Sequence, residues 1–381
     1  MSRPRLLHPL RLCAVLALAT PLLALADPRY TVTEIAGADS YARGINNLGE
    51  VVGTMAAADT YHAFVYAGGS LADLGSFGGS ATAYAINDAG QVVGTTFSTS
   101  SDTPTRGFLY SAGTMNTIGA GSGNTWAYGI NNAGTVVGTM SIDDPESFNI
   151  THAYTYAGGS FADLGTLPTG DSSRAFAINN AGDVVGAAAS AIQGAPNFPE
   201  DPFLYRGGVM TSLGNLGGIW SGATAINDLG QIVGFIGTAY LGGEEIYPQS
   251  AFLYENGVLH NLGGLAPNLN SSARDINNLG QIVGSARIGD GSGHAFLYEN
   301  GAMIDLNMLI DPASGWTILD AAAINELQQI AATACRGDVC QAVRLDLVPS
   351  VPEPSAYALL VAGLAFGFGG GLRRPAGRRR G

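Results

Sequence analysis

The chain contains no lysine, and only 12% of its 381 residues are charged. Between residues 27 and 350 the charge is one-sided. This stretch holds 29 of the 30 Asp and Glu residues and 9 of the 17 arginines, a difference of −20. Proteins that bind nucleic acid need cationic side chains against the phosphates, so this composition excludes that class. An acidic body is typical of a soluble protein, and it leaves weak binding of cations or of basic partners open.

Cysteine is nearly absent as well, with three copies. Cys13 lies in an N-terminal apolar stretch, whereas Cys335 and Cys340 are separated by four residues. In an exported protein such a pair predicts a disulfide across a hairpin. A metal site is a poor alternative, because no histidine or third cysteine is adjacent in the sequence.

Helical spacing is missing from the body of the chain. Instead, the pattern Ala-x-x-Ile-Asn-x-x-Gly-x-Val-Val-Gly recurs about every 45 residues. The isoleucines of its copies are Ile45, Ile86, Ile130, Ile178, Ile226, Ile276 and Ile324. A period of about 40 to 50 residues indicates propeller blades or helical arrays, and the lack of helical spacing favours the propeller.

Each repeat contains four short runs rich in Val, Ile, Tyr, Phe and Thr and bounded by Gly and Asn, which predicts strands. Four antiparallel strands make one propeller blade. We therefore predict an all-β, seven-bladed β-propeller of four-stranded antiparallel blades. The seventh repeat lacks a fourth strand, so Tyr30–Ile35 is predicted to pair with residues 342–346 and close the ring.

The first run of each repeat has a small residue directly before its isoleucine, which fits a strand crowded against the propeller axis. These small residues are Gly44, Ala85, Gly129, Ala177, Ala225 and Ala323. Asp275 interrupts the series in the sixth repeat.

Both ends of the chain carry targeting features. Three arginines (Arg3, Arg5 and Arg11) precede the apolar residues 12–23, which predicts a secretory signal peptide over residues 1–26. The expected cleavage site is formed by Ala24, Ala26 and Asp27. The predicted propeller then covers residues 27–349, and residues 350–381 form a separate tail.

The tail has three parts. A stiff motif comprises Val351, Pro352, Glu353 and Pro354. Residues 355–372 are uncharged and mostly apolar, and as a helix they would be about 27 Å long, close to the thickness of a bilayer core. The basic cluster that follows comprises Arg373, Arg374, Arg378, Arg379 and Arg380. Such a cluster is held on the cytoplasmic side, so the tail is predicted to be a transmembrane anchor with the body outside the cytoplasm.

This order of motif, apolar segment and arginine cluster resembles the PEP-CTERM sorting signal of Gram-negative bacteria. The resemblance implies recognition and removal of the tail by an exosortase, a membrane cysteine protease-transferase. It also implies a host that makes extracellular polysaccharide or biofilm. A plain membrane anchor is the alternative.

The body resembles the HAF-repeat extracellular proteins over most of residues 40–345. The matching residues are the His-Ala-Phe-x-Tyr runs, as at 62–66 and 294–298, and the Ile-Asn-x-x-Gly-x-Val-Val-Gly segments. Members of that family are typically exported and have undefined activity, so the resemblance implies location rather than chemistry.

No catalytic spacing is evident. The asparagines beside the seven isoleucines fit a hairpin turn better than a ring of ligands. His62, His152 and His294 share one repeat position, but the other repeats have different residues there, so a symmetric metal ring is excluded. The scattered loop carboxylates are Asp143, Asp144, Glu146, Glu244 and Glu245. Pairing of such acids in three dimensions would suit glycoside hydrolysis.

The connection between the second and third strands varies in length from repeat to repeat. It is longest over residues 140–151, 187–201 and 235–249. Variable loops on a rigid scaffold commonly carry binding sites. Trp126, Trp220 and Trp316 lie at or just before first strands, hence near the same face, where an indole could stack on a sugar ring. Packing between blades is the alternative interpretation.

The sequence thus favours an exported cell-surface or matrix propeller, without enzymatic activity, cofactor or metal, that binds or structures exopolysaccharide or matrix protein and is processed by an exosortase. A propeller hydrolase or lyase acting on polysaccharide is the alternative. A passive surface-layer component without a specific ligand is a third class.

Overall fold

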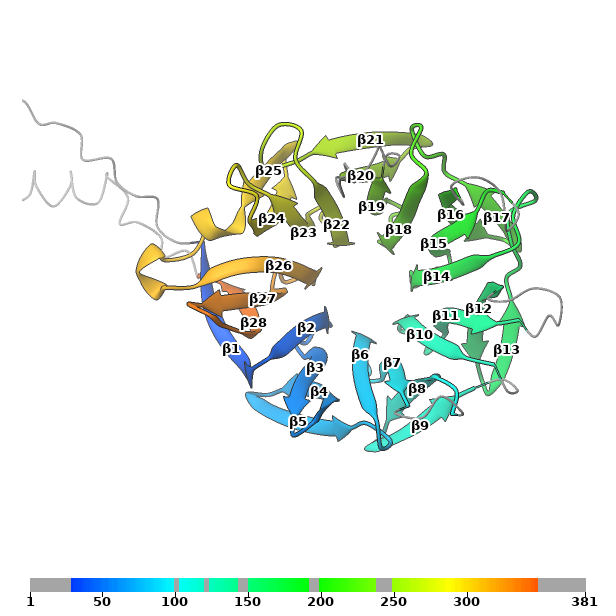
Figure 1. Cartoon of the computed structure of the whole chain (residues 1–381), viewed down its shortest axis with the longest axis horizontal. Coiled ribbons are helices and arrows are strands. Elements are labelled where there is room, and N and C mark those ends of the chain that lie inside the picture. Colours follow the sequence, from blue (N-terminus) through cyan, green and yellow to red (C-terminus); the bar gives the residue numbers. More distant parts are fainter. Residues whose placement is uncertain are drawn as a thin grey trace, which may run out of the picture.

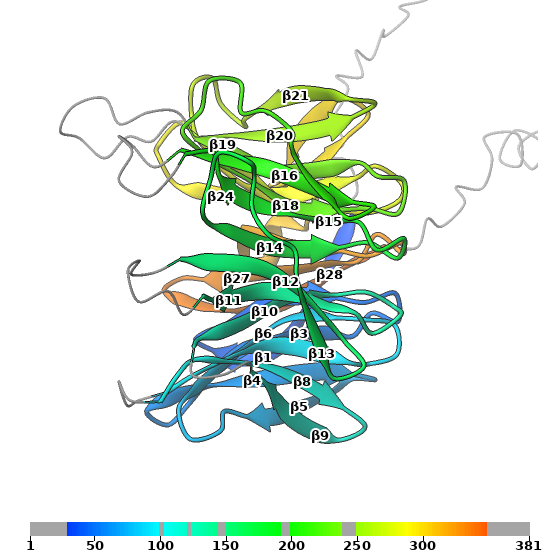
Figure 2. The same cartoon turned by 90° about the vertical axis from the view of Figure 1, so that its right-hand side faces the viewer.

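The computed structural model describes residues 29–98, 103–119, 123–142, 150–191, 199–237 and 249–348. Their regular structure consists of β-strands and two 3-10 turns, η1 (Leu306–Met308) and η2 (Pro312–Ser314), without an α-helix. Figure 1 shows sheets arranged as a ring around a central axis, with the first strand of each repeat nearest to it. Figure 2 shows the ring edge-on, with strands running between its two faces. The described chain is an all-β propeller.

Five of the sheets are four-stranded antiparallel blades. Their strands follow in chain order. The first blade is β2 (Ser40–Ile45), β3 (Val51–Ala57), β4 (Thr60–Ala67) and β5 (Ser70–Gly75). The second is β6 (Ser80–Ile86), β7 (Val92–Phe97), β8 (Arg106–Ser111) and β9 (Thr114–Ile118). The third is β10 (Thr125–Ile130), β11 (Val136–Ser141), β12 (Thr151–Ala157) and β13 (Ser160–Asp163). Another is β22 (Ser271–Ile276), β23 (Ile282–Arg287), β24 (Gly293–Glu299) and β25 (Ala302–Asp305). The last is β26 (Thr317–Ile324), β27 (Ile330–Arg336), β28 (Val339–Leu347) and β1 (Tyr30–Ala38).

The fourth and fifth repeats share one eight-stranded sheet. Its strands are β14 (Ser173–Ile178), β15 (Val184–Ala189), β16 (Glu200–Arg206), β17 (Val209–Ser212), β18 (Trp220–Ile226), β19 (Ile232–Gly237), β20 (Gln249–Glu255) and β21 (Val258–Gly263). The two halves join where Glu200 pairs in parallel with Trp220. The Glu200 amide also donates to the carbonyl oxygen of Ile219 at 3.0 Å.

The predicted set of seven separate four-stranded blades is therefore wrong as stated. Five blades have four strands, and the remaining two repeats form one sheet of eight. The physical reason is the path of the link 213–219, which brings the start of β18 beside the start of β16. No helix in the described part is long and apolar enough to span a membrane. The predicted transmembrane segment 355–372 lies outside the described residues, as do the signal peptide, its cleavage site, the sorting motif and the arginine cluster.

The N-terminal strand joins the last repeat. The predicted pairing of Tyr30–Ile35 with residues 342–346 is present, because β1 runs antiparallel to β28 with Tyr30 opposite Leu347 and Glu34 opposite Val343. Tyr30 is fully buried in the cluster beneath β26–β28. The ends of the described chain thus form one sheet, which leaves no open edge at this point.

Crowding at the second strand explains the motif Val-Val-Gly. A Cβ atom on Gly94 would lie 2.0 Å from the Thr82 carbonyl oxygen and 2.6 Å from the Phe108 ring. The first strand bulges between Ala83 and Ala85, which pushes its backbone toward this glycine. The core lies between neighbouring repeats: Val52 and Ala63 of one repeat pack with residues of the next, including Phe108.

The seven motif asparagines hold the hairpin turns, as predicted, and also join the repeats. In the first turn, Asn46 Oδ1 accepts from the amides of Leu48 and Glu50 at 3.1 and 2.9 Å. Each side-chain Nδ2 donates to the carbonyl oxygen of the equivalent asparagine in the next repeat, at 2.9 to 3.2 Å. The members of this asparagine ring are Asn46, Asn87, Asn131, Asn179, Asn227, Asn277 and Asn325. The bond from Asn325 to Asn46 closes it.

Candidate ligand cleft

Antiparallel strand order gives the ring two different faces. The turns between first and second strands and between third and fourth strands lie on one face, which we call the turn face. The connections between second and third strands, and the links between repeats, lie on the other, the loop face. The loop face contains a cavity of about 850 Å³.

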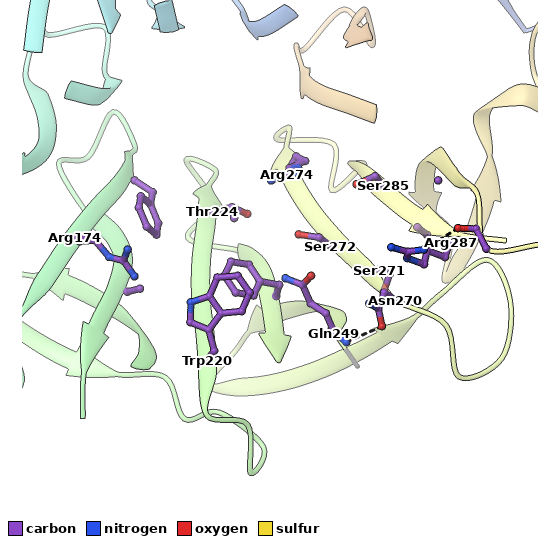
Figure 3. Close-up of a pocket in the computed structure, with 16 residues that line it drawn as sticks. Arg174, Trp220, Thr224, Gln249, Asn270, Ser271, Ser272, Arg274, Ser285 and Arg287 are labelled. Atoms are coloured by element: carbon purple, nitrogen blue, oxygen red, sulfur yellow. Dashed lines mark hydrogen bonds between the residues drawn. The ribbon is translucent and has the colours of Figure 1, made fainter. Parts of the chain in front are cut away.

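Figure 3 shows this cavity, the loop-face cleft, with Arg174 and Trp220 on one side and Ser272, Asn270 and Arg287 on the other. Its wall also includes Arg274 and the polar side chains of Thr224, Gln249 and Ser285. Arg174 comes from β14, Trp220 from β18, Arg274 from β22 and Arg287 from β23. Three of the nine arginines between residues 27 and 350 therefore meet in one cavity, and no described carboxylate lines it.

The three arginines differ in how far their charge is neutralised. Arg174 Nη2 donates to both carboxylate oxygens of Glu200 at 2.6 Å. Arg274 Nε lies 3.4 Å from the Asp320 carboxylate, and both side chains are partly exposed. Arg287 Nη1 donates to the Gly291 carbonyl oxygen at 2.9 Å. Since a backbone carbonyl carries no net charge, Arg287 is the cleft arginine best placed to bind an anionic group.

Aromatic rings form the other component of the cleft. The Trp220 ring packs against Phe235 with centroids 5.0 Å apart, yet the residue remains 49% exposed. On the neighbouring wall, Arg174 lies over the Phe176 ring, 5.8 Å from its centroid. Phe176 makes an edge-to-face contact with Tyr128. An indole held in place with its other side open is suited to stacking on a flat or apolar ligand group.

The three candidate tryptophans have different surroundings. Trp126 lines a second loop-face cavity of about 460 Å³ with Tyr128. Arg174 lines both cavities, and Glu200 lines the second one. Trp316 lies beneath the Arg336 guanidinium, 4.1 Å from its ring centroid, and packs against the core of the last blade. Packing is therefore the role of Trp316, whereas Trp220 and Trp126 line cavities.

The shared histidine position makes a cross-strand pair in each of its three copies. Nδ1 of His62 lies 2.9 Å from the Asp73 carboxylate, and the same atom of His294 lies 2.6 Å from Asp305. The third pair, His152 with Asp163, spans 2.8 Å. Each pair joins the third strand to the fourth across eleven residues. The recurring spacing from His to Asp was the signal that sequence reasoning missed.

Other candidates do not converge on a site. Asp143, Asp144, Glu146, Glu244 and Glu245 lie outside the described residues, as do residues 143–149, 192–198 and 238–248 of the long loops. The described ranges contain no group of three or more His, Cys, Asp or Glu side chains placed to hold a metal ion. Cys335 and Cys340, the pair expected to be joined, form a disulfide across the β27–β28 hairpin.

No family model matches the chain, and no curated protein matches it. Among solved structures, it is similar to the β-propeller domain of the Trilobed protease from Pyrococcus furiosus (TM-score 0.54, 8% identity, 82% of this chain and 94% of that one). The acylaminoacyl peptidase of Pyrococcus horikoshii has a TM-score of 0.49 and 10% identity, and the match covers 81% of this chain and 51% of that one. A puromycin-hydrolyzing peptidase of Mycobacterium tuberculosis has a TM-score of 0.48 and 13% identity, and the match covers 86% of this chain and 53% of that one. The chain spans about half the length of these two peptidases, and at such identities the likeness shows the fold alone.

These neighbours correct the function expected from the sequence. The solved propeller with a TM-score of 0.54 is a domain of a protease. The non-catalytic matrix role, its polysaccharide hydrolase or lyase alternative and the exclusion of enzymatic activity are therefore not retained. The expectation rested on the sorting tail, the variable loops and the tryptophans, and none of these features identifies the ligand of the propeller.

Proposed function

We propose that this propeller binds peptide segments that combine a carboxylate with an aromatic or other apolar side chain, in the loop-face cleft. The observation that carries the proposal is the meeting of Arg174, Arg274 and Arg287 with the open indole of Trp220 in one cavity of an otherwise acidic protein. The protease propeller with the same fold supports a peptide as the ligand class.

Charge and shape both favour such a ligand. An acidic body repels anions in general, so a cavity lined by arginine focuses an anionic group at one place. A guanidinium binds a carboxylate through paired hydrogen bonds, and Arg287 has the least neutralised charge of the three. The amide groups of Gln249 and Asn270 and the hydroxyl groups of Thr224 and Ser285 offer partners for a peptide backbone.

The test uses fluorescein-labelled hexapeptides that pair one phenylalanine with aspartate, asparagine or lysine, titrated into the protein and followed by fluorescence anisotropy. We expect saturable binding of the aspartate peptide and at least tenfold weaker binding of the other two. Arg287→Ala should remove this preference, whereas Arg336→Ala, outside the cleft, should keep it. Equal binding of all three peptides, or no binding, would overturn the proposal.

Peptide hydrolysis is a second candidate, favoured by the His294–Asp305 pair, whose histidine is adjacent in sequence to a cleft residue. His294 follows the cleft residue Gly293, and its Nδ1 faces the carboxylate, which leaves Nε2 as the nitrogen that could take a proton. Incubation with quenched fluorescent peptides tests this. Cleavage that His294→Ala abolishes would support it, and cleavage unchanged in that variant, or none at all, would reject it.

We further propose that the chain is exported, anchored by its tail and processed by an exosortase at residues 351–354. The disulfide supports export, since such bonds persist in oxidising compartments. Intact-mass measurement on protein from a Gram-negative host with an exosortase tests this. Loss of residues 1–26 and of the tail is expected. A full-length mass, or loss of the tail in a host without an exosortase, would contradict it.

A further inference from the structure

Four leucines stand out on the turn face because each occupies the same place in its hairpin turn and each is strongly exposed. Leu48, Leu229, Leu279 and Leu327 are exposed by 68%, 70%, 61% and 58%. We call them the leucine crescent. A single exposed leucine is ordinary on a protein surface, but apolar side chains gathered at one place mark an interaction site.

The crescent occupies consecutive repeats. Side-chain hydrogen bonds of the asparagine ring join these four turns in the order Leu229, Leu279, Leu327 and Leu48. The other three repeats have alanine at this position, and these exposed residues are Ala89, Ala133 and Ala181. The hairpin turn is the same in all seven repeats, so the turn geometry does not require leucine at this position. The leucines are confined to one arc of a nearly symmetric ring.

The crescent borders a polar opening on the axis. The residues after the ring asparagines line this opening, a cavity of about 180 Å³ that we call the mouth ring. Its members are Asn47, Asp88, Asn132, Asn180, Asp228, Asn278 and Glu326. Side-chain oxygens of this ring accept backbone amides of the preceding repeat at 2.8 to 3.1 Å, again around the whole circle.

Three members of the mouth ring are carboxylates without a described cationic partner. Asp88 accepts from the side chains of Asn47 and Asn132, and Asp228 accepts from Asn180. Glu326 accepts from the Asn278 amide. Burial acts to raise the pKa of Asp88, but the hydrogen bonds from Asn47 and Asn132 outweigh it and leave this pKa below its usual value. The mouth therefore remains negative at neutral pH.

Three arginines near the turn face are engaged in ion pairs. Arg206 pairs with Asp183 at 2.7 Å, and Arg344 pairs with Asp346 at 2.8 Å. Arg29 is paired with Glu299. The uncompensated charge next to the crescent is thus negative. A second copy of this acidic chain would be repelled, whereas a partner with cationic groups among apolar ones would be attracted.

We propose that the turn face docks a basic amphipathic segment of a partner protein, which lays its apolar side chains on the leucine crescent and places lysine or arginine over the mouth ring. Burial of the four leucines supplies apolar contact area, and the carboxylates fix the position of the cation. This surface lies on the opposite side of the ring from the loop-face cleft.

The experiment uses a fluorescein-labelled 18-residue Leu/Lys peptide of amphipathic helical pattern and a Leu/Glu peptide of the same pattern, each titrated into the protein and followed by anisotropy. We expect saturable one-to-one binding of the Leu/Lys peptide that weakens as salt is added. The variant Leu229→Ser/Leu279→Ser/Leu327→Ser should bind at least tenfold more weakly. The matched variant Ala89→Ser/Ala133→Ser/Ala181→Ser, altered on the other arc, should bind like the unaltered protein.

Two further variants complete the design. Asp88→Asn/Asp228→Asn/Glu326→Gln should weaken binding several-fold and flatten its salt dependence, and thermal unfolding checks that it folds. Trp220→Ala should leave Leu/Lys binding unchanged, which separates this surface from the proposed cleft. Absence of saturable binding, equal binding of the Leu/Glu peptide, or equal affinity of the two serine variants would each overturn the proposal.

Discussion

The two faces of the ring are built on different principles. On the turn face, each repeat makes the same hairpin, and two circles of hydrogen bonds join neighbouring repeats. On the loop face, the connections differ from repeat to repeat, and a cavity opens where Trp220, Arg274 and Arg287 meet. The repeated sequence therefore specifies the turn face directly, whereas the loop face depends on residues that the repeat does not fix.

This difference separates stability from recognition. Turn-face asparagines are buried and make several bonds each, so the fold depends on them. Loop-face side chains are partly exposed and make few bonds, so they can be changed at little cost. The two proposed binding surfaces follow the same division. The leucine crescent consists of exposed side chains on turns of constant geometry, and the cleft lies among variable connections.

The largest expected effect tests the asparagine ring against the loop face. Asn277 is 2% exposed and makes four bonds: its Nδ2 donates to Asn325 and Gln281, and its Oδ1 accepts two amides. Asn270 on the loop face accepts one amide, from Gln249. Asn277→Ala should lower the free energy of unfolding by about 3 to 4 kcal/mol and Asn270→Ala by about 1 kcal/mol, because each buried group left without its partner is costly. Urea unfolding at pH 7 measures both, and equal losses would contradict the division.

The next largest expected effect on stability concerns Asp275. This residue occupies the position that holds glycine or alanine in the other repeats. Burial raises its pKa to about 6, although the amides of Ile324 and Ile276 bond to the charged form and oppose this. The folded state then holds the proton more tightly than the unfolded state, whose pKa is about 3.9. Stability from this group is therefore present below pH 4 and is lost as pH rises to about 6, by up to about 3 kcal/mol.

Asp275→Asn keeps the shape and removes the titration. Relative to the unaltered protein, this variant should gain stability between pH 4.5 and pH 7, as measured by urea unfolding at both values. Asp290→Asn is the control, since Asp290 lies on an exposed loop. A gain that is the same at both pH values would show that Asp275 does not titrate in this range.

A smaller effect comes from the disulfide across the β27–β28 connection on the loop face. The Cys335–Cys340 bond closes a loop of about six residues, for which chain entropy predicts about 2 kcal/mol. Cys335→Ser/Cys340→Ser should lower the free energy of unfolding by about this amount and abolish the effect of dithiothreitol on stability. If the reductant destabilises the double variant as well, the disulfide is not the source of the effect.

Much of the architecture was accessible from the sequence because each repeat encodes its own hairpins. The pairing of Tyr30–Ile35 with β28 and the turn role of the asparagines both followed from local patterns. The merging of two repeats into one sheet of eight did not, since it depends on the path of a single link beside Glu200. The hydrogen bonds between repeats in the asparagine ring were not predicted, because a turn within one repeat already explains the asparagines.

The cleft could not have been assembled from the sequence for a similar reason. Arg174 and Arg287 belong to different repeats and occupy different positions within them, so no spacing links them. Tryptophan gave a partial signal: the three residues were placed near one face, but which of them packs and which stays open depends on neighbours such as Arg336 and Phe235. Local patterning identifies strands and turns, whereas a site between repeats needs their relative placement.

The smallest expected change in stability is that of Trp220→Ala, and it distinguishes the role of Trp220 from that of Trp316. Trp220 is half exposed, so Trp220→Ala should lower the free energy of unfolding by at most about 1 kcal/mol. Trp316 packs against the core of the last blade under Arg336, so Trp316→Ala should cost about 2 to 3 kcal/mol. Binding of the aspartate–phenylalanine hexapeptide should show the reverse order, with at least a tenfold loss for Trp220→Ala and none for Trp316→Ala. Since a cleft that recognises an aromatic side chain needs an open indole, equal affinities in the two variants would show that Trp220 is surface packing rather than part of a site.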